Sequence, residues 1–461
     1  MINKITSLFY KLFDLDSAER QKMLVGGFLF FAIVSSYTLA QEMKYSVFSA
    51  MVGSKLVPVA KIAAFVILFP AILLDGYLVD RFKRYKLVIL YTFVFGALGL
   101  IFTFFLAHPT IGIDNQNKDV GRIFGWCFFF YVEGFAPFLL GVFWAFINSI
   151  HTPANAQRTY AFIVSFSKVG GVLLTGCVYA FLKNYSLFSN NFNETTKIQL
   201  VLLVASLLLV SAGLFLFIMI KKLNLDVFNG YNTKIVENNK KTGAWTGIKI
   251  LFQNKYVFYV FLLVFLGDVI SEIVNYKRIL IVVDSKASSL LGLSHALSEL
   301  YLQMIYMHAI GLALSMIVTN SIMRLLRTRV SLFVMPALSL LFALTYVITG
   351  ADSIIIWLYI ILKACSYTIG TPIRESLYIV TSSDVQFKAK FAIDAVGNKL
   401  ARNTGQGLNY LTNVVGKHYG AFVSALALNT VLVSLPVCWL FTAYFVGKIY
   451  NTTLKKNKVI G

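Results

Sequence analysis

Residues 363–407 read KACSYTIGTPIRESLYIVTSSDVQFKAKFAIDAVGNKLARNTGQG, with apolar, membrane-like sequence on both sides. The stretch carries nine charged side chains, from Lys363 to Arg402. Lys363 falls within the preceding apolar span, and Asp394 belongs to the helical pattern that begins the next. Charges at membrane depth are costly and usually face a water-filled path. We therefore interpret this stretch as part of a pathway wall; the alternative is ion pairing that only joins two helices.

The composition excludes an ordinary soluble enzyme. Of 461 residues, 58% are hydrophobic and only 13% are charged, and the mean hydropathy is +0.74. These values are typical of a polytopic helical membrane protein. The net charge of +21 indicates basic cytoplasmic loops, a cavity that attracts anions, or both. No phosphate-binding loop and no metal-ligand spacing occurs in the sequence. We expect no enzyme, no cofactor, no metal site and no nucleic-acid partner.

About twelve apolar spans of membrane length follow one another along the chain. We place them near residues 24–40, 56–79, 87–107, 123–150, 160–182, 199–220, 256–275, 304–323, 330–349, 353–371, 391–415 and 421–446. The fold class expected is all-α and polytopic, with two six-helix halves.

The chain divides at its longest polar linker. We expect an amphipathic segment on the inner membrane surface at 1–23, a first half at 24–220, the linker at 221–255, a second half at 256–446 and a tail at 447–461. Lysine and arginine gather before the first span, after the second, sixth and eighth, and in the tail. These are alternate loops, so the positive-inside rule predicts that both termini are cytoplasmic.

Charged residues recur inside the predicted spans of both halves. Lys61, Glu133 and Lys168 fall within the first half, while Lys44 follows its first span closely. In the second half, Asp268 and Glu272 lie four residues apart on one face of a helix. Lysines suit phosphate groups as compact point charges. The carboxylates are interpreted as modulators of binding or as proton sites, or alternatively as neutralising partners of nearby lysines.

The loop after the second span resembles a known transporter signature. The sequence DGYLVDRFKRYK at 75–86 matches G-x-L-x-D-R-x-G-R-R of the major facilitator superfamily at Gly76, Leu78, Asp80, Arg81 and Arg84. The resemblance implies a two-halved transporter of major-facilitator type, which binds its substrate between its halves.

Four further stretches resemble the bacterial and plastid ATP/ADP translocases. The family's helix 1 sequence Y-T-I-L-R-D-T-K-D-T-L is similar to YTLAQEMKYSV at 37–47. Its G-x-E-x-I-P-x-x-K resembles the segment from Gly53 to Lys61, and its F-W-x-F-A-N-x-I-T-T resembles FWAFINSIHT at 143–152. The stretch at 366–396 is similar to the family's K-Y-S-L-F-D-A-T-K-E-M-A-Y-I-P and K-G-K-A-A-I-D-V-V.

The resemblance implies which residues serve nucleotide transport. The family's helix 1 lysine, helix 4 and helix 7 acidic residues and helix 11 lysine correspond to Lys44, Glu133, Glu272 and Lys390 or Lys388. The complete predicted substrate site comprises Lys44, Lys61, Glu133, Lys168, Glu272, Lys388, Lys390 and Asp394, with Asp268 or Glu272 as a possible proton site. Four departures leave the choice of nucleotide open: Gln41, Tyr45, Lys55 and Lys168 replace the residues that the family carries at these positions.

The sequence therefore predicts a nucleotide transporter, of ATP/ADP exchange type, that works by alternating access. One alternative is a proton-coupled importer of another nucleotide or organic anion. Another, from a different class, is a membrane regulator or scaffold that no longer transports. We expect a monomer in a bacterial inner membrane, with the lipid bilayer and a nucleotide as its partners. The resemblance implies that the bacterium is an intracellular one.

Overall fold

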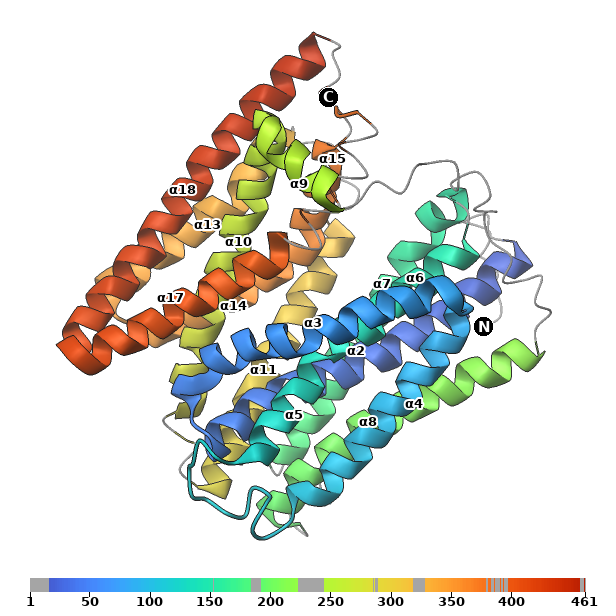
Figure 1. Ribbon diagram of the computed structural model, residues 1–461, viewed down its shortest axis with the longest axis vertical. Helices are drawn as coiled ribbons and strands as arrows, with labels where there is room; N and C mark the ends of the chain where they lie inside the picture. The colour runs from blue at the N-terminus through green and yellow to red at the C-terminus, as the bar shows by residue number, and fades with distance from the viewer. Residues whose placement is uncertain are drawn as a thin grey trace. The chain divides into compact units, whose positions relative to one another are not determined.

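The computed structural model describes residues 16–151, 153–183, 192–222, 244–284, 286, 289–317, 328–378, 380–382, 385, 390, 393, 397–456 and 460. The described residues are nearly all helical, as the sequence predicts (Figure 1). Of their helices, ten are long and apolar enough to cross a membrane. Two more helices have similar length: α11 (Leu290–Ile317), which is also apolar, and α17 (Asn398–Tyr419), which has a more polar composition. The prediction of about twelve membrane helices is confirmed. The predicted segment at 1–23 lies mostly outside the described residues.

The chain packs into two compact units. Unit 1 comprises Met1–Gly53, Val66–Glu237 and Lys286–Ile305, and unit 2 comprises Ser54–Phe65, Asn238–Ser285 and Tyr306–Gly461. Helix α3 (Val57–Arg81) thus begins in unit 2 and continues in unit 1. The predicted linker at 221–255 is described only at its two ends, and the division of the chain at this linker stays a prediction.

Unit 1 is built around α2 (Ser17–Met51), which packs against α7 (Pro153–Leu182) and α8 (Glu194–Lys222). Helix α2 starts where Asp16 and Glu19 form reciprocal side-chain bonds to each other's backbone N–H, a capping box. Helix α4 (Arg84–Leu106) packs against α8, and the fourth span packs against α2. That span runs through α5 (Ile123–Glu133), a wide turn at Phe135–Leu140 and α6 (Gly141–Ile150).

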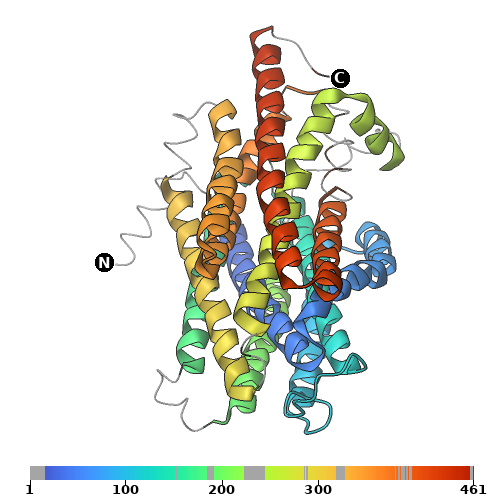
Figure 2. The ribbon, with the colours of Figure 1, turned by 90° about the vertical axis from the view of Figure 1, so that its left-hand side faces the viewer.

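Unit 2 has α10 (Lys255–Ile279) at its centre, in contact with α14 (Asp352–Cys365), α17 and α18 (Ala421–Lys455). Figure 2 shows α17 and α18 as a hairpin, with α13 (Thr328–Thr349) beside α18. The two hairpin helices meet at Gly420, whose φ of +89° is a conformation that glycine adopts without strain. The remaining helices are α9 (Ala244–Gln253) and α15 (Thr371–Leu377).

Two predicted helix limits differ most from the observed ones. Helix α2 continues eleven residues past the predicted end at Ala40, to Met51. Helix α11 starts at Leu290 rather than at Met304. In both places the additional turns carry polar or charged side chains that the unit buries, among them Lys44 and Ser298. A span predicted from hydropathy ends at such residues because the hydropathy average falls at polar side chains, whether or not the fold buries them.

Candidate functional site

Lys44 and Glu133 form a close ion pair inside unit 1. The Lys44 ammonium on α2 lies 2.6 Å from Glu133 Oε1, at the last residue of α5. The Lys44 side chain is 2% exposed, whereas that of Glu133 is 28% exposed. The ammonium also lies 4.5 Å from the centre of the Tyr45 ring and 5.1 Å from that of Phe129, within the range of cation–π attraction. The Lys44 ammonium therefore lies beside two aromatic rings and contacts the more exposed carboxylate of Glu133.

The local sequence explains why Glu133 stands at this point. Gly134 ends α5, and Pro137 in the following wide turn lacks the backbone N–H of a regular helix. The helix widens over Phe135–Leu140 before α6 begins. Wide turns of this kind inside membrane helices often lie next to functional residues.

A second ion pair, Lys61 with Glu272, lies within unit 2. Lys61 Nζ, near the start of α3, is 2.6 Å from Glu272 Oε2 on α10. The side chains are 13% and 10% exposed. The same carboxylate oxygen accepts a hydrogen bond of 2.7 Å from Gln406 Nε2 on α17. Asn409 Nδ2 is 3.4 Å from the backbone carbonyl of Glu272.

Further charged side chains surround this second pair. Lys363 on α14 and Arg402 on α17 lie close enough to attract the Glu272 carboxylate electrostatically. Arg402 Nε is also 3.8 Å from Asp268 Oδ2, and its side chain is 59% exposed. Lys61, Lys363 and Arg402 thus outnumber the carboxylates Asp268 and Glu272, so this part of unit 2 favours an anion.

Lys390 occupies a third, more open position. Its ammonium is 2.5 Å from Glu375 Oε2 on α15, and the side chains are 31% and 50% exposed. Lys390 Nζ also lies 5.7 Å from the centre of the Tyr378 ring. Lys168 is half-buried on α7 in unit 1. The predicted site residues Lys388 and Asp394 lie outside the described residues.

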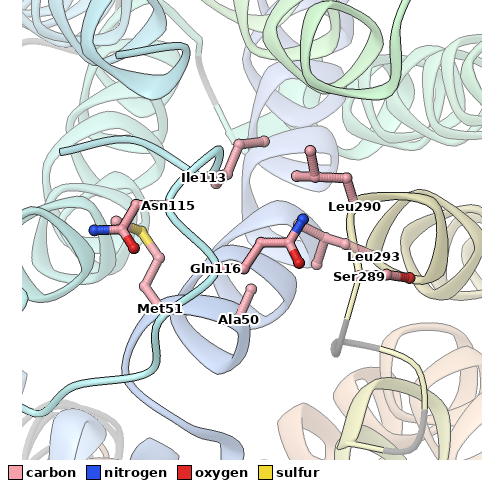
Figure 3. A pocket seen from close by; sticks show the side chains of 8 residues that line it. All are labelled: Ala50, Met51, Ile113, Asn115, Gln116, Ser289, Leu290 and Leu293. Carbon is pink, nitrogen blue, oxygen red and sulfur yellow. The ribbon is translucent and has the colours of Figure 1, made fainter. Parts of the chain in front are cut away.

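A small pocket in unit 1 contains none of these charged residues. It is formed where the end of α2 meets the loop after α4 and the start of α11, and Met51, Asn115, Gln116 and Leu293 line it (Figure 3). Its lining is apolar or neutral and carries no charge, so it offers nothing to balance a polyphosphate. The charged clusters, and not this pocket, are the candidate site.

The chain matches the family model described as the TLC ATP/ADP transporter over residues 122–450. It belongs to this family. The matched region includes Glu133, Glu272, Lys390 and Gln406. Lys44 and Lys61 precede it.

The relatives of this TLC family chain are distant. ADP,ATP carrier protein 3 of Rickettsia prowazekii is 22% identical over 308 residues, which are 59% of this chain and 60% of that protein. The protein of the same name in Rickettsia felis is 21% identical over 346 residues, 67% of this chain and 66% of that protein. Each match thus spans less than two thirds of the relative's length.

Solved transporter structures share the fold of this TLC family member. The E. coli xylose transporter XylE in its inward open conformation superposes with a TM-score of 0.58 and 15% identity, covering 93% of this chain and 96% of that one. The nucleoside transporter NupG gives a TM-score of 0.52 and 14% identity, covering 95% and 100%. The predicted major-facilitator-like fold is confirmed.

Sequence reasoning missed three members of the unit 2 cluster. The sequence shows Lys363 and Arg402 as charges within residues 363–407, but it does not indicate that they neighbour Glu272. Gln406 carries no charge that would draw attention to it. One signal was available: residues 402, 406 and 409 follow the i, i+4, i+7 spacing of a single helix face. Only the packing of α17 against α10 indicates what this face contacts.

The approach of α17 to α10 depends on Gly405. A Cβ atom at this residue would lie 2.9 Å from Glu272 Cβ and 3.0 Å from the Val269 carbonyl oxygen. We expect Gly405→Ala to destabilise the protein by about 1–3 kcal/mol, because the backbone must move to relieve the overlap. The measurement is the thermal unfolding midpoint of detergent-solubilised protein.

The matched control is Gly407→Ala, two residues along the same helix, where a Cβ meets no atom within 4 Å. This change should leave the midpoint unchanged or raise it slightly, because alanine favours helix more than glycine does. Equal midpoints for the two variants would contradict the close contact of α10 and α17.

Proposed function

We propose that this protein is a membrane transporter of nucleotides that exchanges ATP-type and ADP-type substrates by alternating access. The observation that carries the proposal is that two lysine ammonium groups with low exposure, Lys44 and Lys61, each contact a carboxylate at 2.6 Å. Membership of the TLC ATP/ADP transporter family supports it, as do relatives named ADP,ATP carrier proteins.

The chemistry follows from the ion pairs. An ammonium that a carboxylate already neutralises can stay in a low-dielectric site when substrate is absent, since the paired charges offset each other's desolvation cost. A nucleotide phosphate offers the same kind of anionic oxygen, so it can take the place of Glu133 on Lys44 or of Glu272 on Lys61. In unit 1, we propose Lys168 as a further source of positive charge. In unit 2, we propose Lys388 and Lys390 in the same role, with Asp268 and Asp394 limiting the net charge when no substrate is bound.

Selectivity depends on the positions at which the chain departs from the family pattern. Tyr45 lies buried beside Lys44 with its ring edge-on to Phe129, where the family has a carboxylate. Lys55 is exposed ahead of α3, where the family has a glutamate. Both changes make the site less negative, so we propose that this transporter accepts more highly charged phosphates than a typical ATP/ADP exchanger.

The proposed setting is a bacterial inner membrane. The alternation of basic loops along the chain supports cytoplasmic termini, and the bilayer surrounds the membrane helices. We propose that one chain transports by itself, as a monomer.

Reconstitution into proteoliposomes tests the function. We expect uptake of labelled ADP only into vesicles preloaded with nucleotide, with no effect of a proton uncoupler. Competition with a panel of other nucleotides and organic anions then gives the substrate class.

Two results would contradict this proposal in different ways. Uptake into empty vesicles that collapses with the uncoupler would favour proton-coupled import, for which Asp268 and Glu272 are the candidate proton sites. No uptake of any panel member by inserted protein would favour the regulator or scaffold.

A further inference from the structure

Gln406 has a specific relation to the second ion pair. Its side chain is on α17, the residue is 1% exposed, and its Nε2 donates to Glu272 Oε2 at 2.7 Å. Lys61 donates to this same oxygen at 2.6 Å. One carboxylate oxygen therefore receives one charged and one neutral donor, from residues 211 and 134 positions away in the chain.

The surroundings fix this arrangement. Gly405 brings the α17 backbone against Glu272 and Val269. Asn409, which is 2% exposed, lies 3.4 Å from both the Glu272 carbonyl and Gln406 Oε1. Because both polar ends of the Gln406 amide have partners, its orientation is set, and its N–H points at the carboxylate.

The pair also joins the beginning of α3 to the rest of unit 2. Other contacts of the same segment include two hydrogen bonds, from the Ser54 hydroxyl to Asp284 and from Asn413 Nδ2 to the Lys55 carbonyl at 3.2 Å. Lys399 Nζ also lies 5.9 Å from the centre of the Phe65 ring. The two hydrogen bonds contain no side-chain cation, and the contact of Lys399 contains no carboxylate. In the Lys61–Glu272 contact, by contrast, an anionic ligand can compete directly for the ammonium.

We propose that Gln406 is a positioning residue that holds the Glu272 carboxylate on Lys61 while the site is empty, so that Glu272 acts as a built-in substitute for a substrate phosphate. The proposal rests on the function proposed above. When a nucleotide phosphate binds Lys61, Glu272 is released, and the beginning of α3 loses its ionic attachment to α10. Without nucleotide the attachment persists, and the empty transporter does not change the side to which it opens. Gln406 thereby ensures that nucleotide leaves on one side only when another nucleotide is taken up on the other.

The test measures leak against exchange in proteoliposomes loaded with labelled nucleotide. Efflux is recorded with and without unlabelled nucleotide outside. The leak ratio is the rate without external nucleotide divided by the rate with it. In Gln406→Leu the carboxylate loses a donor and the pair opens more often, so we expect the leak ratio to rise at least fivefold over the unsubstituted protein. General damage to the fold would lower both rates and would not raise the ratio.

Gln199→Leu is the matched control. Gln199 Nε2 on α8 donates to the Thr103 carbonyl at 2.9 Å, so this variant loses an amide hydrogen bond that involves no charged group. Its leak ratio should stay at the unsubstituted value. An unchanged leak ratio in well-inserted Gln406→Leu overturns the positioning role. Failure of the unsubstituted protein to exchange nucleotide would instead overturn the proposed function.

Gln406→Glu keeps the side-chain length and gives a second readout should the leucine variant insert poorly. A protonated carboxyl donates to Glu272 as the amide does, whereas an ionised one repels Glu272 and Asp268 and competes for Lys61, Lys363 and Arg402. The leak ratio of this variant should therefore be near normal at low pH and rise with pH, relative to the unsubstituted protein at each pH. A leak ratio that does not depend on pH would contradict the proposal.

Discussion

Replacing Lys44 with glutamine should lower nucleotide exchange at least tenfold, equivalent to about 1.4 kcal/mol of binding free energy. We expect this loss because glutamine can still donate a hydrogen bond but lacks the positive charge that attracts phosphate. Lys44→Arg should restore exchange only in part, since the planar guanidinium must fit the space between Tyr45 and Phe129 that an ammonium occupies. The measurement is exchange in proteoliposomes, normalised to the amount of inserted protein.

A stability effect has to be separated from this loss. Removing one partner of a fully buried pair costs about 3–5 kcal/mol. We expect a smaller cost here, because Glu133, which loses its partner, is 28% exposed and can be hydrated. The double variant Lys44→Gln with Glu133→Gln replaces the ion pair by two neutral amides, so it should recover the unfolding midpoint and not the exchange. If Lys44→Gln inserts and exchanges normally, Lys44 only joins α2 to α5.

Lys390→Gln should also lower exchange at least tenfold, and here we expect little change in stability. The pair of Lys390 with Glu375 is partly exposed, and a pair of this kind contributes about 0–1 kcal/mol. Loss of exchange with an unchanged unfolding midpoint would therefore identify a residue that acts on the substrate. The readout is the same exchange assay combined with thermal unfolding.

Lys456→Gln is the control for a lost lysine charge. Lys456 is exposed immediately after the end of α18, so its replacement should change neither exchange nor stability. Normal exchange by Lys390→Gln would mean that Lys390 serves only its contact with Glu375, and the phosphate-binding role would then fail for this residue.

The sequence determined the class of protein because the relevant signals are local. Hydropathy over some twenty residues identifies membrane helices without any knowledge of their neighbours. The short stretches resembling the translocases were likewise sufficient for the family, which the match over 122–450 establishes. Charges in apolar sequence marked Lys61, Glu133 and Glu272 as residues that need an explanation.

Only the tertiary structure decided which charges meet. Lys44 and Glu133 are 89 residues apart, and Lys61 and Glu272 are 211 apart, so no periodicity relates the partners. The spacing of Asp268 and Glu272 predicted a shared helix face, and Arg402 lies close to both carboxylates. The contact of Glu272 with Lys61 could not be predicted from that spacing. Helix packing brings these groups together: because Gly405 has no side chain, α17 approaches α10 closely enough for Gln406 to reach the Glu272 carboxylate.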